Sequence, residues 1–257
     1  MKLTKLFSDD SGFRINSSQT FSVKTQASWE SVRQALVFAY QMTFTGEGSH
    51  RSHRSGGSHN RKPGEILADT FQGKLAEFCF AEAMQNIGYS LSPDTSVSKL
   101  GVWDDSDFHL VGKTVGVKST KHFGNLLLLE MKDWAEGGVY LPGTSNSNTK
   151  AIYDAMVLVR IDRELRQSLK ADRLLYSSDL SWDDLVKIVR VSPWHFDIPG
   201  YATKSMLNEA VTENLTLKKG SILNGRTQID ADNYYIQSGD LISISTLIPY
   251  LESQNNE

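Results

Sequence analysis

An aspartate and a lysine flank a predicted β-hairpin near the middle of this chain. Asp107 opens the first strand and Lys118 lies near the end of the second, with a tight turn predicted at Gly112–Lys113. Because side chains alternate along a strand, the hairpin can bring the carboxylate and the ammonium group to one surface. A carboxylate suits a hard divalent cation, and a nearby lysine stabilises negative charge developing on a phosphate. Together these are the groups that phosphodiester hydrolysis needs.

A long helix and two buried strands are expected to hold this hairpin in place. The apolar spacing predicts a helix over Glu65–Ile87, and Glu77 is the one acid on a face of small or apolar residues. Two apolar runs after the hairpin, 125–130 and 153–161, predict buried strands, and the first run ends at Glu130. This order of helix and strands predicts an α/β fold.

The flanking segments carry shorter patterns. A helix is predicted over 28–44, with short strands before it. The elements predicted after the second buried strand are a helix over 163–174, a helix beginning at 181–185, a strand over 187–191, a turn at 197–201, a helix over 204–211, and short strands over 217–244 before a last short helix.

The composition of the 257-residue chain narrows the class of protein. Its hydrophobic fraction of 39% and charged fraction of 22% fit a globular protein with one large domain, or one domain and an appendage. A single cysteine, Cys79, excludes a disulfide framework, and no segment predicts a signal peptide or a membrane span. We therefore expect a cytoplasmic protein with no membrane partner. The net charge of −3 argues against a nonspecific DNA coat, but not against a nuclease with one basic cleft.

A Gly-, Ser- and His-rich segment, 45–64, cannot pack a core. It is either a solvated loop or an arm that orders on DNA, because arginine, lysine and glycine suit phosphate contacts. A zinc site from His50, His53 and His59 is disfavoured, since no cysteine is near and Gly/Ser spacers would leave the ligands unsupported. The candidate DNA contacts in this segment are Arg51, Arg54, Arg61 and Lys62.

Three short motifs resemble, in their order, those of the PD-(D/E)XK nuclease superfamily, which includes type II restriction endonucleases and many repair and phage nucleases. They are Gly73–Glu77 in the long helix, Ser106–Phe108 at the start of the hairpin and Gly116–Thr120 in its second strand. The motifs are short, but their order and strand setting agree over about residues 65–161. The resemblance implies a restriction endonuclease-like core, which is a mixed central β-sheet flanked by helices, here with a small β-rich C-terminal part.

The resemblance also implies a role for four residues. Asp107 matches the metal-ligating acid of the family, and Lys118 matches the lysine that positions the attacking water. Val117 matches the residue whose backbone carbonyl commonly ligates the metal, and Glu77 matches the helix glutamate that many members use. The implied cofactor is Mg2+, which would polarise the scissile phosphate and activate a water.

One position departs from the family pattern. The second acid of the family lies two residues before the lysine, where this chain has Gly116. Glu130 on the next strand or Glu77 on the helix would then complete the metal site. In another register, Glu130–Lys132 itself spells acid-x-lysine, although the compact hairpin favours Lys118 over Lys132. A third interpretation is that Gly116 marks an inactive site.

Three segments are expected along the chain. Residues 1–64 would form an N-terminal segment with a helix and the basic loop, 65–190 the nuclease core, and 191–257 an accessory part. The accessory part would serve DNA recognition or dimerisation, or simply pack on the core. The further candidate DNA contacts are Ser119, Lys121, Arg226 and Asn233, since such side chains bind phosphates and base edges.

The resulting hypothesis is a Mg2+-dependent endonuclease that hydrolyses double-stranded DNA as a sequence-specific type II restriction enzyme. A phage or repair nuclease is the nearest alternative. The rival from another class is a catalytically inactive DNA-binding module with a nuclease fold. Asp107 would then be a turn residue in an acidic run, and Lys118 a solvated lysine on an edge strand.

Overall fold

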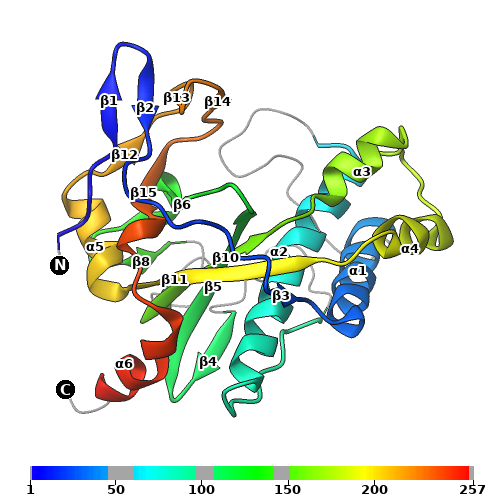
Figure 1. Ribbon diagram of the computed structural model, residues 1–257, viewed down its shortest axis with the longest axis horizontal. Coiled ribbons are helices and arrows are strands. Elements are labelled where there is room, and N and C mark those ends of the chain that lie inside the picture. Colours follow the sequence, from blue (N-terminus) through cyan, green and yellow to red (C-terminus); the bar gives the residue numbers. More distant parts are fainter. Residues whose placement is uncertain (1, 46–60, 97–106, 142–150, 255–257) are drawn as a thin grey trace.

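The computed structural model describes residues 2–45, 61–96, 107–141 and 151–254, and it has a mixed α/β fold (Figure 1). At its centre is a five-stranded sheet. β5 and β10 of this sheet run parallel and the other neighbours run antiparallel, so the sheet is mixed. In spatial order its strands are β3 (Thr25–Gln26), β11 (His195–Thr203), β10 (Ala155–Ile161), β5 (Lys113–Lys121) and β4 (Phe108–Leu110).

β4 and β5 form the predicted hairpin, in which Phe108 lies opposite Val115 and Leu110 opposite Lys113. The turn is Val111–Gly112, one residue earlier than predicted, and these residues have φ of 46° and 79°. Positive φ at both central positions matches the twist of a two-residue hairpin. Glycine adopts such a φ without strain, which explains its place at the second position.

α1 (Trp29–Phe44) packs on α2 (Pro63–Gln85), and α2 covers one face of the central sheet. Both helices match those predicted from apolar spacing. Pro63 occupies the first turn of α2, where a backbone amide would have no helical partner. Phe80 of α2 contacts Phe108 of β4, with ring centroids 5.3 Å apart. This packing fixes the face of α2 against the hairpin.

β10 is buried on both faces because two hydrophobic cores meet at it. Val157 and Val159 face the core under α1 and α2, whereas Met156 and Leu158 face a second core. This alternation explains why all seven residues of the strand are buried. Its one charged residue, Arg160, is therefore buried as well.

The second core lies between the central sheet and a three-stranded sheet, with α5 (Lys204–Thr212) packed beside it. The three strands are β6 (Leu126–Glu130), β15 (Asn233–Gln237) and β12 (Thr216–Leu217). β6 is the buried strand predicted over 125–130. It pairs with β15, and so it belongs to a different sheet from the hairpin.

Smaller elements complete the described part of the fold. One further sheet contains β1 (Phe7–Asp9), β2 (Gly12–Arg14), β13 (Ile222–Leu223) and β14 (Thr227–Gln228). Another contains β7 (Trp134–Ala135), β8 (Val139–Tyr140) and β9 (Ala151–Ile152). The remaining helices are α3 (Leu165–Ala171), α4 (Trp182–Arg190), α6 (Leu247–Ser253) and the 3-10 helices η1 (Met131–Asp133), η3 (Ser238–Asp240) and η4 (Ile244–Thr246).

Two predicted elements after residue 180 are wrong. The strand predicted over 187–191 is the end of α4, whose two buried residues lie four positions apart as on a helix face. The turn predicted at 197–201 lies inside β11. A Cβ at Gly200 would lie 2.3 Å from the Ile242 carbonyl oxygen, so this glycine serves a close approach of two backbone segments rather than a turn.

The central sheet takes strands from all three segments expected from the sequence. β3 comes from 1–64, β4, β5 and β10 from 65–190, and β11 from 191–257. Residues from each segment also share the core under α1 and α2. The segments are therefore interleaved in one packed unit.

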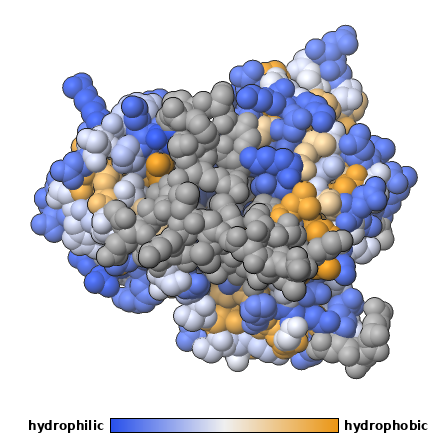
Figure 2. Space-filling model, turned by 180° about the vertical axis from the view of Figure 1, so that it is seen from behind, coloured by the Kyte–Doolittle hydropathy of each residue, from blue (hydrophilic) through white to orange (hydrophobic). Residues whose placement is uncertain are grey.

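Within the described ranges, no helix is both long and apolar enough to cross a bilayer. On the face seen from behind, apolar residues form small groups among hydrophilic ones (Figure 2). Scattered apolar residues of this kind are ordinary for a protein surface in water.

Candidate active site

The Asp107 carboxylate is tied to the strand that carries Lys118. Asp107 directly precedes β4, and its Oδ2 accepts a hydrogen bond from the Val117 amide over 2.6 Å. The hairpin therefore places the carboxylate beside the backbone of β5, one residue before Lys118. Three of the residues singled out by the sequence, Asp107, Val117 and Lys118, lie together.

The protonation of Asp107 depends on opposing influences. Burial raises the pKa of its carboxyl above the ordinary value, because the ionised form loses solvation. The Val117 amide and the positive charges of Lys118 and Lys74 lower the pKa in part. A shielded carboxyl faced by specific charges is typical of functional sites.

Lys74 and Glu77 form an ion pair on α2, and the Lys74 charge acts on Asp107. The Lys74 ammonium lies 2.5 Å from Glu77 Oε2 and donates to the Asp94 carbonyl oxygen over 2.7 Å. It also lies 4.5 Å from the centroid of the Phe38 ring, and the Lys74 side chain is only 9% exposed. Since its charge acts on Asp107, Lys74 links the helix glutamate to the hairpin.

Sequence reasoning missed Lys74, although a signal for it was present. Lys74 lies one helical turn before Glu77, so the two side chains share a face of α2. It is a cation within a stretch whose neighbours are buried and apolar, where an unpaired charge is costly. A partner for this lysine was therefore to be expected at i+3.

Gly116 has no room for the acid that the family pattern would place there. A Cβ at this position would lie 2.7 Å from Met156 Sδ and 2.8 Å from Tyr153 Cε1. Real Cβ contacts are longer, so a side chain would displace Met156 or the Tyr153 ring. The space next to Asp107 and Lys118 on this face of β5 is taken by the second core.

Glu130 and Lys132 lie in a different setting from the hairpin. Glu130 ends β6, opposite Asn233 of β15. Lys132 belongs to the 3-10 helix η1 rather than to a strand, and its ammonium lies 3.4 Å from Glu130 Oε2. Glu130 Oε2 is buried and makes no hydrogen bond within the described part of the chain. No contact described here joins Glu130 to Asp107.

The donor groups bear on whether the site suits Mg2+. Within the described residues, no three His, Cys, Asp or Glu side chains come together as a metal site. Mg2+, however, usually keeps several waters and uses only one or two carboxylates together with substrate phosphates. Asp107, Glu77 and the Val117 carbonyl are hard oxygen donors of this kind. The residues therefore fit a Mg2+ ion whose remaining ligands are water and phosphate.

The candidate DNA contacts differ widely in their surroundings. Arg51 and Arg54, like the three histidines of the same loop, lie outside the described residues. Lys62 and Arg226 are exposed, and Ser119 is half-buried on β5. The others are engaged within the protein: Arg61 lies 3.3 Å from Asp69, Lys121 lies 2.7 Å from Glu164, and the buried Asn233 donates to the Ala231 carbonyl.

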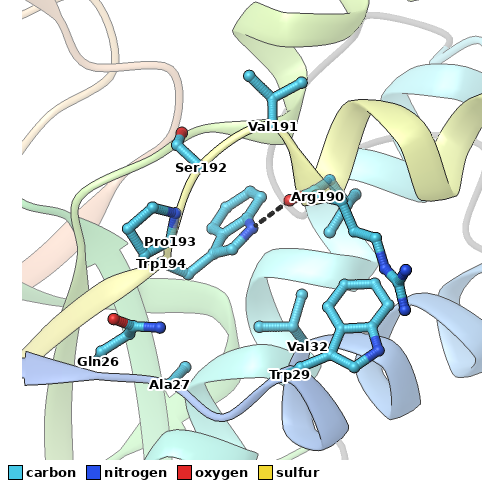
Figure 3. A pocket seen from close by; sticks show the side chains of 10 residues that line it. Gln26, Ala27, Trp29, Val32, Arg190, Val191, Ser192, Pro193 and Trp194 are labelled. Atoms are coloured by element: carbon cyan, nitrogen blue, oxygen red, sulfur yellow. Dashed lines mark hydrogen bonds between the residues drawn. The ribbon is translucent and has the colours of Figure 1, made fainter.

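A separate hollow of about 540 Å3 lies where α1, β3 and the end of α4 meet (Figure 3). Trp29 and Trp194 form its walls, and the Arg190 guanidinium stacks 4.2 Å from the Trp29 ring centroid. The Trp194 indole donates to the Val189 carbonyl, which fixes its ring. Among the described residues that line the hollow, none is an acid and Ser192 alone offers a hydroxyl, so the hairpin is the stronger candidate for chemistry.

Comparisons with models of protein families, with curated proteins and with solved structures found no match to this chain.

Proposed function

We propose that this protein is a Mg2+-dependent endonuclease that hydrolyses DNA phosphodiester bonds. The observation that carries the proposal is the Asp107 carboxylate, which is bonded to the Val117 amide one residue before Lys118. The charge of a buried lysine from α2 acts on the same carboxylate. Carboxylates for a hard cation and ammonium groups for a phosphate are the chemistry that this reaction needs.

The roles of the residues follow from their chemistry. Asp107, the Val117 carbonyl and Glu77 would hold the ion, which when bound polarises the scissile phosphate and lowers the pKa of a water. The Lys118 ammonium orients the attacking water and offsets the negative charge that develops on the phosphate. Loss of one such electrostatic contact typically costs about 3–4 kcal/mol in the transition state.

The substrate and setting are part of the same proposal. A sequence-specific type II restriction enzyme is the role we favour, and a phage or repair nuclease is the alternative. One hydrolytic centre cuts one strand at a time, so double-strand cleavage would use two copies of the chain. The single thiol, Cys79, is buried, and burial raises its pKa. A buried thiol with a raised pKa is unreactive, which is compatible with a reducing cytoplasm.

A digest of plasmid DNA tests the proposal directly. The protein with Mg2+ should cut the plasmid, and a chelator should stop the cutting. Asp107→Asn and Lys118→Met should each lower the cleavage rate by at least about a hundredfold, while a gel-shift assay shows DNA binding retained. Discrete fragments would indicate a sequence-specific enzyme, and a smear a less selective nuclease. Full activity in both variants would refute the assignment of the site.

The second candidate function is a DNA-binding module without catalysis. The packing of Met156 and Tyr153 at Gly116 favours it, because the usual second acid is sterically excluded there. The same digest separates the two functions. DNA binding without cleavage under any divalent ion would support the module.

A further inference from the structure

Lys74 occupies a position built for a cation. A carboxylate oxygen of Glu77, the carbonyl oxygen of Asp94 and the face of the Phe38 ring all surround its ammonium. Oxygen donors of these two kinds are also the ligands of hard metal ions, and an aromatic face likewise attracts a positive charge. The Lys74 ammonium therefore uses a donor, Glu77 Oε2, that a divalent ion would need.

The acidic and basic groups of the site are equal in number. Asp107 and Glu77 carry two negative charges when ionised, and Lys118 and Lys74 carry two positive ones. The ammonium groups therefore balance the carboxylates before any metal ion enters. A buried charge is costly without a partner of opposite sign, so Lys74 and Glu77 stabilise each other.

We propose that Lys74 is a positioning residue that holds Glu77 and competes with the divalent ion for it. This inference rests on the function proposed above. In the ion-free protein the ammonium keeps the Glu77 carboxylate in place. Glu77 would be a ligand of a bound ion only by giving up its contact with the ammonium, and the Lys74 charge would then be available to a phosphate.

Direct measurement of Mn2+ binding to the free protein tests this competition. Electron paramagnetic resonance titrations would compare the wild type with Lys74→Met and Lys74→Gln, which remove the charge and shorten the side chain by one atom. Both variants should bind Mn2+ about tenfold more tightly, because a positive charge next to the ion is lost. In the double variant Lys74→Met/Glu77→Gln the gain should disappear.

Two controls keep the effect specific. Lys74→Arg retains the charge and should bind Mn2+ as weakly as the wild type. Lys113→Met removes a lysine at the other end of β5, where the ammonium donates to the Gln254 carbonyl over 2.8 Å, and should leave the affinity unchanged. Circular dichroism and the unfolding midpoint would establish that each variant is folded.

The outcomes separate this inference from the proposed function. If the wild type cleaves DNA but Lys74→Met and Lys74→Gln bind Mn2+ no more tightly, the competition is refuted and the nuclease stands. Tighter binding by Lys74→Arg, or an equal gain in Lys113→Met, also refutes it. If no variant binds Mn2+ and none cleaves DNA, both proposals fail.

Discussion

At the residue scale, the pKa of Asp107 is set by influences that act in opposite directions. Desolvation disfavours its charge, while one backbone amide and two ammonium groups favour it. Burial outweighs the other influences and raises the pKa of Asp107, so ionising this carboxylate costs the folded protein stability. Functional groups are commonly kept in such unfavourable states by the surrounding fold.

This cost predicts how stability depends on pH. Below the ordinary aspartate pKa of 3.8, Asp107 is protonated in both the folded and the unfolded chain and contributes no pH dependence. As the pH rises from there to the raised folded pKa, the unfolded chain loses the proton first, so stability falls. Asp107→Asn cannot ionise, and we expect it to match the wild type near pH 3 and to unfold at a higher temperature at pH 7.

Thermal unfolding of both proteins between pH 3 and pH 8 would measure this difference. A variant less stable than the wild type at pH 7 would contradict the prediction. The difference between the two curves isolates Asp107, because all other acids are common to both proteins.

Gly116 and Gly73 make a matched pair of glycines for a second prediction. Gly116→Ala should destabilise the protein by about 1–3 kcal/mol, because its Cβ would meet Met156 and Tyr153. Gly73→Ala on α2 should stabilise it by about 0.5–1 kcal/mol, because no described atom lies within 4 Å of the added carbon. Urea denaturation would measure both changes. Equal effects at the two sites would show that the second core does not close on β5.

At the scale of elements, α2 carries two groups of the site and is held near its start by α3. Arg166 of α3 donates to the buried Glu65 over 2.8 Å, and its guanidinium also lies 3.4 Å from Asp69. The Glu65 carboxylate also accepts a hydrogen bond from the Lys62 backbone amide. This network fixes the rotation of α2, and with it the face that carries Lys74 and Glu77.

Removal of the Arg166 charge tests how strongly this network holds the helix. Arg166→Met should destabilise the protein by about 1.5–3 kcal/mol, since Glu65 is buried and loses a charged partner. The control is Lys187→Met, which breaks an exposed pair with Asp184 and should change stability by less than about 1 kcal/mol. Equilibrium unfolding in urea distinguishes the two. Similar small losses in both variants would mean that the network does not fix α2.

The long, strongly apolar elements were predicted from their apolar runs and spacing. α2 and β10 are of this kind, and the hairpin was predicted to within one residue at its turn. The strand predicted over 187–191 failed because Val189 and its neighbours fit a short strand and the last turn of a helix equally well. The turn predicted around Gly200 was wrong because the glycine there makes room for the Ile242 carbonyl, which is distant in sequence.

The candidate site was predictable where its residues are neighbours in one element. Asp107, Val117 and Lys118 lie in or next to one hairpin, so the pairing of its two strands alone brought them together. The hydrogen bond from Lys74 to the Asp94 carbonyl joins α2 to a loop twenty residues later. The space at Gly116 is occupied by Met156 of β10. Neither contact follows from the local sequence pattern. Long-range packing decided both.

At the scale of the whole molecule, one buried arginine joins distant parts of the chain. The Arg160 guanidinium makes a bidentate pair with Asp197. It also donates to the Gln19 and Thr20 carbonyls and to the Asn125 side chain. One guanidinium thereby joins four parts of the chain: the N-terminal segment, β10, β11 and the residue before β6. Arginine suits this role better than lysine because it has five donors in a fixed plane.

The order of strands in the central sheet also bears on how the protein is made. β10 lies between β5 and β11, and β3 pairs only with β11, which is among the last long elements of the chain. During synthesis the hairpin therefore leaves the ribosome before β10 and β11 have emerged to support it. We expect the nascent chain to remain without a working site until β11 has emerged, so a nuclease of this design would not act on DNA before that stage of translation.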